Sequence, residues 1–250
     1  MKTIMTAGKG GTGKSVILAN LLIHHILPHS NGNTLVVDAD PHQSLSLLLA
    51  TQYHFDVPTS LGELRHRHGE ALRSGKGLEQ ASRSELADIL VQQALVPLPG
   101  GALLVMGGND QPGCQCVVNN LLGKALDALR ERFDLAVVDN EAGVEHIGRH
   151  SGWAVDVLLL MTSPRALDMN VAEKILIHAQ AVQRDIRHSI LVINRYQSEY
   201  EKLQTAGIAL TLPNTNLWLT LPYSQSLDAA DQPDPEWLSG LQILWNFVRQ

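Results

Sequence analysis

Cysteine and aromatic residues are scarce in this sequence of 250 residues, which has two Cys, three Phe and four Trp. Two cysteines are too few for a disulfide scaffold, so the fold must depend on a hydrophobic core. Aromatic residues make up 4% and charged residues 18%, against 44% hydrophobic residues. This balance is typical of a globular protein and excludes a disordered, collagenous or coiled-coil chain.

An excess of positive charge is also missing, because 19 Lys and Arg face 25 Asp and Glu for a net charge of −6. We therefore expect no nucleic acid partner, since a wide basic face is needed for duplex DNA. The longest apolar runs, Val16–Leu27 and Val155–Met161, are interrupted or shorter than the roughly 18–20 residues that span a bilayer. A glycine-rich run at Gly8 leaves no room for a signal peptide before it. These features predict a cytoplasmic protein with reduced thiols and no membrane partner.

Strand-like and helix-like segments alternate along the chain. Helices are expected over 16–27, 119–132 and 170–184, and they are long enough to connect parallel strands. Consecutive apolar residues without alternation indicate parallel strands covered on both faces. Such runs occupy residues 3–7, 34–38, 103–106, 135–139, 155–161, 190–194 and 217–221. The pattern predicts a single α/β domain over residues 1–250, with a mostly parallel sheet covered by helices on both faces.

Two regions depart from this alternation. The stretch Tyr53–Gly101 is polar and is expected to be a helical insertion on the surface, with a helix near Ser84–Leu95. The segment Asp228–Gln250 holds an amphipathic helix with apolar residues at helical spacing, from Trp237 to Val248. Its only basic residue is Arg249, which favours packing on the core over binding to a membrane surface.

Residues 8–15, GKGGTGKS, match the phosphate-binding pattern G-x-x-x-x-G-K-[ST] between an expected strand and an expected helix. The glycines allow consecutive backbone N–H groups to face phosphate oxygens, and the helix N-terminus adds partial positive charge. Lys14 is expected to reach the β- and γ-phosphates of ATP or ADP, and the Ser15 hydroxyl to coordinate Mg²⁺. The motif predicts a P-loop NTPase whose nucleotide site includes Gly10, Gly11, Thr12, Gly13, Lys14 and Ser15.

Carboxylates follow two of the expected strands. Asp38 and Asp40 end the run Val36–Pro41, and Asp139 ends the run 135–139. Ligands of open α/β sheets bind beyond the carboxyl ends of the strands, so these side chains are expected near the phosphates. There they can hold Mg²⁺ or orient an attacking water. Capping of the following helices is the alternative role for them.

The second loop lysine, Lys9, makes the loop resemble the deviant Walker A loop of the MinD/ParA/nitrogenase-iron-protein group. The resemblance implies that Lys9 contacts nucleotide bound by the partner subunit in a homodimer. It implies that Lys9, Lys14 and Asp40 are catalytic and that Asp40 positions the attacking water. It further implies Mg²⁺ binding by Ser15, Asp40 and Asp139, a switch II with Glu141 and Gly143, and adenine contacts by Asn194 and Pro222.

Both cysteines lie two residues apart, at Cys114 and Cys116. Side chains two apart in an extended segment project to the same side, which suits ligation of a soft metal. Two thiolates are half of the four that a closed site usually needs. The deficit suggests that two chains contribute one pair each across a two-fold axis, while two unligated loop thiols remain the alternative.

Residues 112–122 and 139–146 together resemble the CooC-type ATPases, which are maturation factors of nickel carbon monoxide dehydrogenase. The resemblance implies an ATP-dependent metallochaperone that binds Ni²⁺, or Zn²⁺, through the C-x-C pairs of two subunits, with that dehydrogenase as client. Two alternatives stay open. One is a reductase component with an iron–sulfur cluster, like the nitrogenase iron protein. The other is a MinD/ParA-type positioning ATPase.

Overall fold

The computed structural model of the protein describes residues 1–64, 66–67, 83–107, 129–140, 155–181, 186–198, 217–228 and 232–249. Within these ranges the centre of the molecule is one sheet of eight strands in the order β3-β4-β2-β5-β1-β6-β7-β8. The strands are β1 (Lys2–Gly8), β2 (Thr34–Asp38), β3 (Leu95–Leu98), β4 (Gly101–Val105), β5 (Leu135–Asp139), β6 (Val155–Thr162), β7 (Ile186–Tyr196) and β8 (Leu217–Pro222).

All neighbouring strands are parallel except β3, which pairs antiparallel with β4. The mostly parallel sheet and each of the seven expected strands are therefore confirmed. Strand β1 lies at the centre, between β5 and β6, because its residues are apolar enough to be covered on both faces. The central position brings the loop after β1 next to the ends of β5 and β6.

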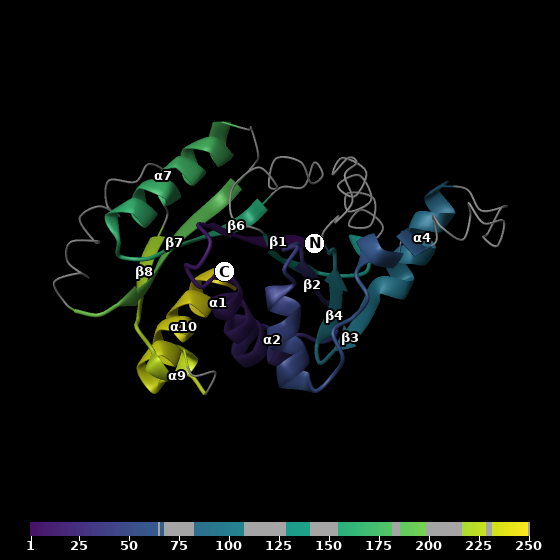
Figure 1. Ribbon diagram of the computed structural model, residues 1–250, viewed down its shortest axis with the longest axis horizontal. Coiled ribbons are helices and arrows are strands. Elements are labelled where there is room, and N and C mark those ends of the chain that lie inside the picture. The colour runs from purple at the N-terminus through teal and green to yellow at the C-terminus, as the bar shows by residue number, and fades with distance from the viewer. Residues whose placement is uncertain are drawn as a thin grey trace.

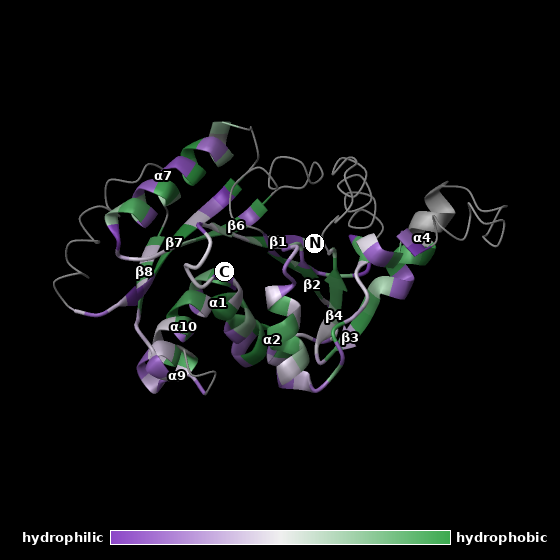
Figure 2. Cartoon of the chain, viewed as in Figure 1, coloured by the Kyte–Doolittle hydropathy of each residue, from purple (hydrophilic) through white to green (hydrophobic). Residues whose placement is uncertain are grey.

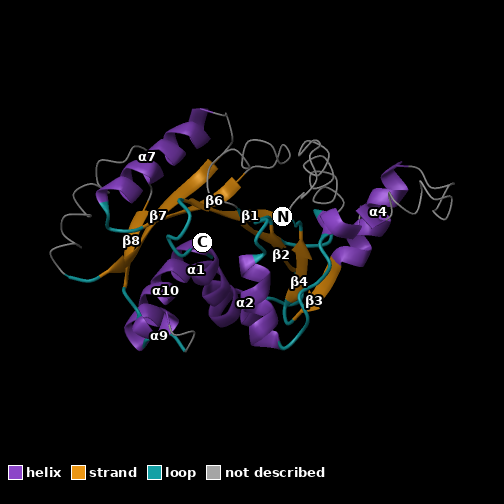
Figure 3. Cartoon of the chain, viewed as in Figure 1, coloured by secondary structure: helices purple, strands orange, loops and turns teal. Residues whose placement is uncertain are grey.

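Helices cover the sheet on both faces (Figures 1 and 3). The described helices are α1 (Lys14–Leu21), α2 (Ser44–Tyr53), α4 (Arg83–Ala94), α7 (Ala166–Ala181), α9 (Gln225–Asp228) and α10 (Pro235–Val248). Helices α1, α2 and α10 lie on one face and α7 on the other, with two separate apolar layers between helices and sheet. Along α7, hydrophilic and hydrophobic residues alternate as expected of a helix with one buried side (Figure 2).

The helix expected over residues 16–27 continues in a different geometry. After α1 the chain forms a π-helical turn, η1 (Leu22–Ile26), and then a 3₁₀ turn, η2 (Leu27–His29). Pro28 stands at the start of the 3₁₀ turn, and the backbone becomes extended at Ser30. The helical run thus ends close to the expected boundary, at a turn that contains Pro28. The helix expected over 119–132 falls almost entirely outside the described residues.

The expectation of a surface helical insertion over Tyr53–Gly101 is wrong for its C-terminal part. Helix α4 agrees with the expected helix, but its residues Leu90, Val91 and Ala94 are buried in the core. Residues Leu95–Leu98 then form strand β3, which belongs to the sheet. A short strand with a proline fits the edge position, where one side of the strand needs no partner.

Helix α10 packs on the same face as α1, as expected. Its residues Trp237, Leu241, Leu244 and Val248 are buried, whereas Phe247 is 41% exposed. One side of the helix therefore packs against the hydrophobic core. None of the helices in the described ranges has both the length and the apolar character needed to cross a bilayer.

Candidate nucleotide-binding site

The loop that joins β1 to α1 is shaped by its glycines. Gly8 has φ +145°, and a Cβ there would lie 2.2 Å from the Met161 carbonyl oxygen on β6. Gly13 begins α1 in the left-handed region with φ +92°, and its carbonyl accepts the first helical hydrogen bond from Ile17 N at 2.9 Å. Within the part of the chain that the structure describes, no side chain caps this helix, and its first turn has no acidic residue. Its N–H groups and partial positive charge are therefore left for an anion.

Contacts within the loop hold it in shape. The Thr12 hydroxyl donates to the Lys9 carbonyl at 2.8 Å, and Lys14 Nζ donates to the carbonyls of Gly8 at 3.1 Å and Lys9 at 3.3 Å. Thr12 is 2% exposed, so its hydroxyl serves the loop itself. Lys14 lies over the loop, where its ammonium group can meet phosphate oxygens.

Asn194, at the end of β7, ties the loop to the neighbouring part of the sheet. Its Nδ2 donates to the Thr12 carbonyl at 3.1 Å, and a Cβ on Gly13 would lie 2.5 Å from the same nitrogen. Arg195 reaches the Gly11 carbonyl at 3.4 Å. The side-chain amide therefore touches the nucleotide loop directly, and Gly13 has no room for a side chain.

Asp139 is the centre of the polar network beside the loop. Its Oδ1 accepts from the Thr6 hydroxyl at 2.7 Å and its Oδ2 accepts from the Ser15 hydroxyl at 2.6 Å. Burial raises the pKa of Asp139, while hydrogen bonds from Ser15 and Thr6 and the charge of Lys14 oppose that rise. Thr6 also accepts from the backbone N–H of Asn140 at 3.2 Å. The network fixes both carboxylate oxygens next to the first turn of α1.

Asp38 organises the segment after β2. Its Oδ2 accepts from the backbone N–H of Ser46 at 2.8 Å and from the Ser46 hydroxyl at 2.6 Å. Burial raises the pKa of Asp38 to about 6, against the opposing effect of the bonds from Ser46. Asp38 pairs in register with Asp139 on β5, and the two buried charges repel each other. Asp38 therefore fixes the N-terminus of α2 from the adjacent strand end.

Asp40 hydrogen-bonds within its own loop. Its Oδ1 accepts from the backbone N–H of His42 at 3.0 Å, and its Oδ2 accepts from the Ser44 hydroxyl at 3.3 Å. These bonds stabilise the turn before α2. Asp40 is not the N-cap residue of that helix, which is Gln43. Asp40 still lies close enough to raise the pKa of Asp139 by repulsion. The described geometry thus brings Asp40 to the edge of the site without a bond to the phosphate loop.

The donor set fits Mg²⁺. The Ser15 hydroxyl and the Asp139 carboxylate are hard oxygen ligands, and they are in direct contact at 2.6 Å. A Mg²⁺ ion takes one or two such protein ligands together with water and phosphate oxygens. A cation there would also relieve the repulsion between Asp38, Asp40 and Asp139. The residues present can therefore hold both the phosphates and their metal ion.

The side chain of Lys9 forms an ion pair outside the phosphate loop. Its Nζ lies 2.6 Å from Oδ1 of Asp168 in the first turn of α7, and the two side chains are 42% and 10% exposed. The hydrogen bond from Lys9, with a second from Ser163, holds the pKa of Asp168 below its usual range. The loop lysine is thus engaged by its own chain.

The expected site residues are partly assembled. Lys14, Ser15 and Asp139 converge, and Asn194 joins them through the loop. Pro222 lies at the end of β8, in register beside Tyr196 on β7. Four expected residues, namely Glu141 and Gly143 of switch II and the metal ligands Cys114 and Cys116, lie outside the described residues.

Sequence reasoning missed Thr6, Asn140 and Asp168. A polar residue in an apolar buried strand was the available signal for Thr6, which is 0% exposed. Asn140 follows Asp139 directly, and its Nδ2 donates to the Thr6 carbonyl at 3.1 Å. For Asp168, the available sequence signal was its position at the start of a helix, because its partner Lys9 is 159 residues away in the chain.

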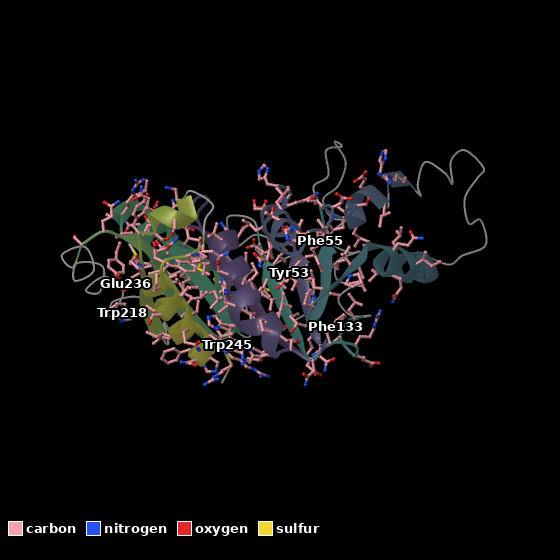
Figure 4. The ribbon with its side chains drawn as sticks, turned by 90° about the horizontal axis from the view of Figure 1, so that it is seen from below. Tyr53, Phe55, Phe133, Trp218, Glu236 and Trp245 are labelled. Carbon is pink, nitrogen blue, oxygen red and sulfur yellow. The ribbon has the colours of Figure 1, made fainter. Side chains whose placement is uncertain are left out.

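A hollow of about 290 Å³ at the opposite ends of the strands is not part of this site. It is lined by Ile26, His29, Ser30, Asn31, Asn33, Thr34, Asp134, Leu135 and Trp245. Trp245, labelled in Figure 4 beside α1, stacks on His25 with ring centroids 6.4 Å apart. None of the residues that line the hollow belongs to the phosphate loop or contacts that loop.

Comparison with known proteins agrees with this geometry. The family model described as the CobQ/CobB/MinD/ParA nucleotide binding domain matches residues 3–234. An uncharacterised ATP-binding protein of Methanocaldococcus jannaschii is 31% identical over 248 residues, which cover 97% of this chain and 90% of that protein. The carbon monoxide dehydrogenase accessory protein CooC of Rhodospirillum rubrum is 28% identical over 238 residues, covering 92% and 86%.

Solved structures show the same fold at lower identity. The cell division protein MinD of Aquifex aeolicus has a TM-score of 0.66 at 16% identity, covering 100% of this chain and 98% of that chain. The septum site-determining protein MinD of Pyrococcus horikoshii, complexed with Mg-ADP, has a TM-score of 0.65 at 17% identity, covering 99% and 96%. This chain therefore belongs to the CobQ/CobB/MinD/ParA nucleotide-binding domain family and is a P-loop ATPase of that family.

Proposed function

We propose that the protein is a homodimeric metallochaperone that couples ATP binding and hydrolysis to capture and delivery of Ni²⁺, or of Zn²⁺. Its client would be a nickel carbon monoxide dehydrogenase. The observation that carries the proposal is the pair Cys114 and Cys116 in a chain that CooC matches over 92% of its length. The metal ion is cargo here, held by thiolates for transfer.

The nucleotide half of the proposal rests on the site geometry. Lys14 binds the β- and γ-phosphates, and Ser15 with Asp139 holds Mg²⁺, which supplies positive charge to the reacting phosphate when bound.

 The carboxylate of Asp40 hydrogen-bonds within its own loop, to His42 N and to the Ser44 hydroxyl. We assign it water positioning and a share of Mg²⁺ binding because it follows Asp38 and lies close to Asp139.

The adenine half of the nucleotide is assigned to the ends of β7 and β8. Asn194 is 5% exposed and already touches the phosphate loop through Thr12, so its amide lies on the nucleotide side of the sheet. An amide offers both a donor and an acceptor to the edge of a base. Pro222 ends the adjacent strand and would cover the ring.

The proposal of a dimer rests on two features, the role assigned to Lys9 and the pair of cysteines, each of which needs a second chain. Lys9 is proposed to contact the nucleotide of the partner subunit. Two cysteines supply half of a tetrahedral thiolate site, so a two-fold axis through the pairs would complete it. In this proposal, ATP binding brings the two cysteine pairs together, and ATP hydrolysis separates them.

The packing of α10 favours this proposal over a membrane-positioning ATPase. Trp237, Leu241, Leu244 and Val248 are buried against the sheet, so they are already used by the fold. An amphipathic helix that binds a membrane needs its apolar face free.

The test is sedimentation velocity during titration with Ni²⁺, in the presence of ADP or a non-hydrolysable ATP analogue. We expect one tightly bound Ni²⁺ per two chains with the ATP analogue, and loss of that ion in the variant Cys114→Ser, Cys116→Ser. Unchanged Ni²⁺ binding by the double serine variant would refute the metal half of the proposal.

Lys9→Ala is the matched control, because it keeps both thiols. If nucleotide brings the half-sites together, this variant should bind Ni²⁺ without the stoichiometry of one ion per two chains. An unchanged stoichiometry would mean that the thiolate site forms independently of ATP.

A further inference from the structure

The ion pair of Lys9 with Asp168 is more than a surface contact. Lys9 Nζ lies 2.6 Å from Asp168 Oδ1, and the carboxylate side chain is only 10% exposed. In the proposed function, Lys9 contacts the nucleotide bound by the partner subunit, and the inference rests on that function. A lysine held inside its own protomer must be released before it can reach across a dimer.

Asp168 is built into the fold as a fixed anion. Its Oδ2 accepts from the Ser163 hydroxyl at 2.6 Å, and its backbone N–H donates to the Arg165 carbonyl at 2.9 Å. It stands in the first turn of α7, where the helix dipole favours negative charge. Lys9, by contrast, is 42% exposed on a flexible stem. Of the two partners, Lys9 is the one that can leave.

The surroundings of the pair face outward. Leu167, next to Asp168, is 65% exposed, a large apolar side chain at the carboxyl end of the sheet beside the nucleotide loop. An exposed leucine alone is ordinary, but here it adjoins the lysine that the proposed dimer uses. A partner subunit placed over the loop would cover both.

We propose that Asp168 is a latch that holds Lys9 within its own protomer, so that Asp168 sets how much ATP is needed for dimerisation. The triphosphate of a partner-bound ATP carries more negative charge than one carboxylate and competes for the ammonium group. ADP lacks the γ-phosphate and competes less well. The latch therefore favours dimerisation with ATP over dimerisation with ADP.

The test is Asp168→Asn, which keeps the shape of the side chain and removes its charge. The measurement is the dimer dissociation constant by sedimentation velocity with a non-hydrolysable ATP analogue and with ADP. We expect the dissociation constant to fall about tenfold, because two partly exposed ion pairs no longer have to open for each dimer. The ADP complex should begin to dimerise as well.

Asp156→Asn is the matched control. Asp156 also lies on an ion pair, with Arg187 at 2.8 Å, and its side chain is 14% exposed, but it stands at the opposite end of β6. This variant should dimerise like the parent. A second control is the double variant Lys9→Ala, Asp168→Asn, which should show no gain over Lys9→Ala because the latch acts only through Lys9.

The outcomes separate the latch from the proposed function. If the parent does not dimerise with the ATP analogue, the proposed dimer fails and the latch fails with it. If the parent dimerises but Asp168→Asn has the same or a weaker dimer, the latch alone is overturned. A change of tenfold in the affinity of the lone protomer for fluorescent ADP would also overturn it, since a latch leaves that binding unchanged.

Discussion

The hydroxyl of Thr6 should be a main support of the buried carboxylate of Asp139. Replacing Thr6 by Val keeps the shape of the side chain and removes two hydrogen bonds, one to Asp139 Oδ1 at 2.7 Å and one from Asn140 N at 3.2 Å. Each buried group left without a partner costs about 1–3 kcal/mol. Because one hydroxyl serves both bonds, we expect a loss of about 3 kcal/mol in the free energy of unfolding.

Urea denaturation measures this loss. With a slope of roughly 3 kcal/mol per molar urea, the midpoint should fall by about 1 M. Thr162→Val is the matched control, since Thr162 is also 0% exposed, but among the described residues its hydroxyl donates only to the Ser163 carbonyl at 3.3 Å. Equal midpoints for the two variants would refute the reasoning. Thr6→Val should also need more Mg²⁺ for ATP hydrolysis, because Asp139 loses one of the two bonds that orient it.

Three further perturbations test the same structure. Burial raises the pKa of Asp38 to about 6. The carboxyl group of Asp38 ionises at a lower pH in the unfolded chain than in the folded protein. The free energy of unfolding should therefore fall by about 3 kcal/mol as the pH rises from roughly 4 to 6. Asp38→Asn should remove that fall in urea titrations at several pH values. Gly13→Ala should destabilise the protein by at least about 1 kcal/mol more than Gly32→Ala. Both glycines have positive φ, but only at Gly13 would a Cβ meet Asn194, at 2.5 Å. Burial lowers the pKa of His25, so the stability due to its neutral ring is lost as pH falls below about 6.5. Melting temperatures of His25→Phe should therefore depend less on pH than those of the parent.

The strands and the core of the site could be predicted from the sequence because their signals are local. Buried strands such as β2 and β5 are unbroken apolar runs, and a carboxylate at the end of each must emerge at the same edge. The contact between Ser15 and Asp139 follows from the loop motif and this edge.

Other features depend on contacts that no local pattern reveals. Strand β3 was missed because Leu95–Leu98 is short and contains a proline, which usually argues against a strand. The π-helical turn at Leu22–Ile26 has the composition of an ordinary helix. The bond from Lys9 to Asp168 joins residues on different elements, so only the folded chain brings them together.

Strand β3 also protects the edge of the sheet that it forms. It has four residues, and Pro97, which pairs in register with Ala102 on β4, has no N–H to offer another chain. Unpaired edges invite other chains to add strands, and a short strand interrupted by proline resists this. A second copy that approached this border would meet a short ladder interrupted at Pro97, which disfavours growth of the sheet into an aggregate.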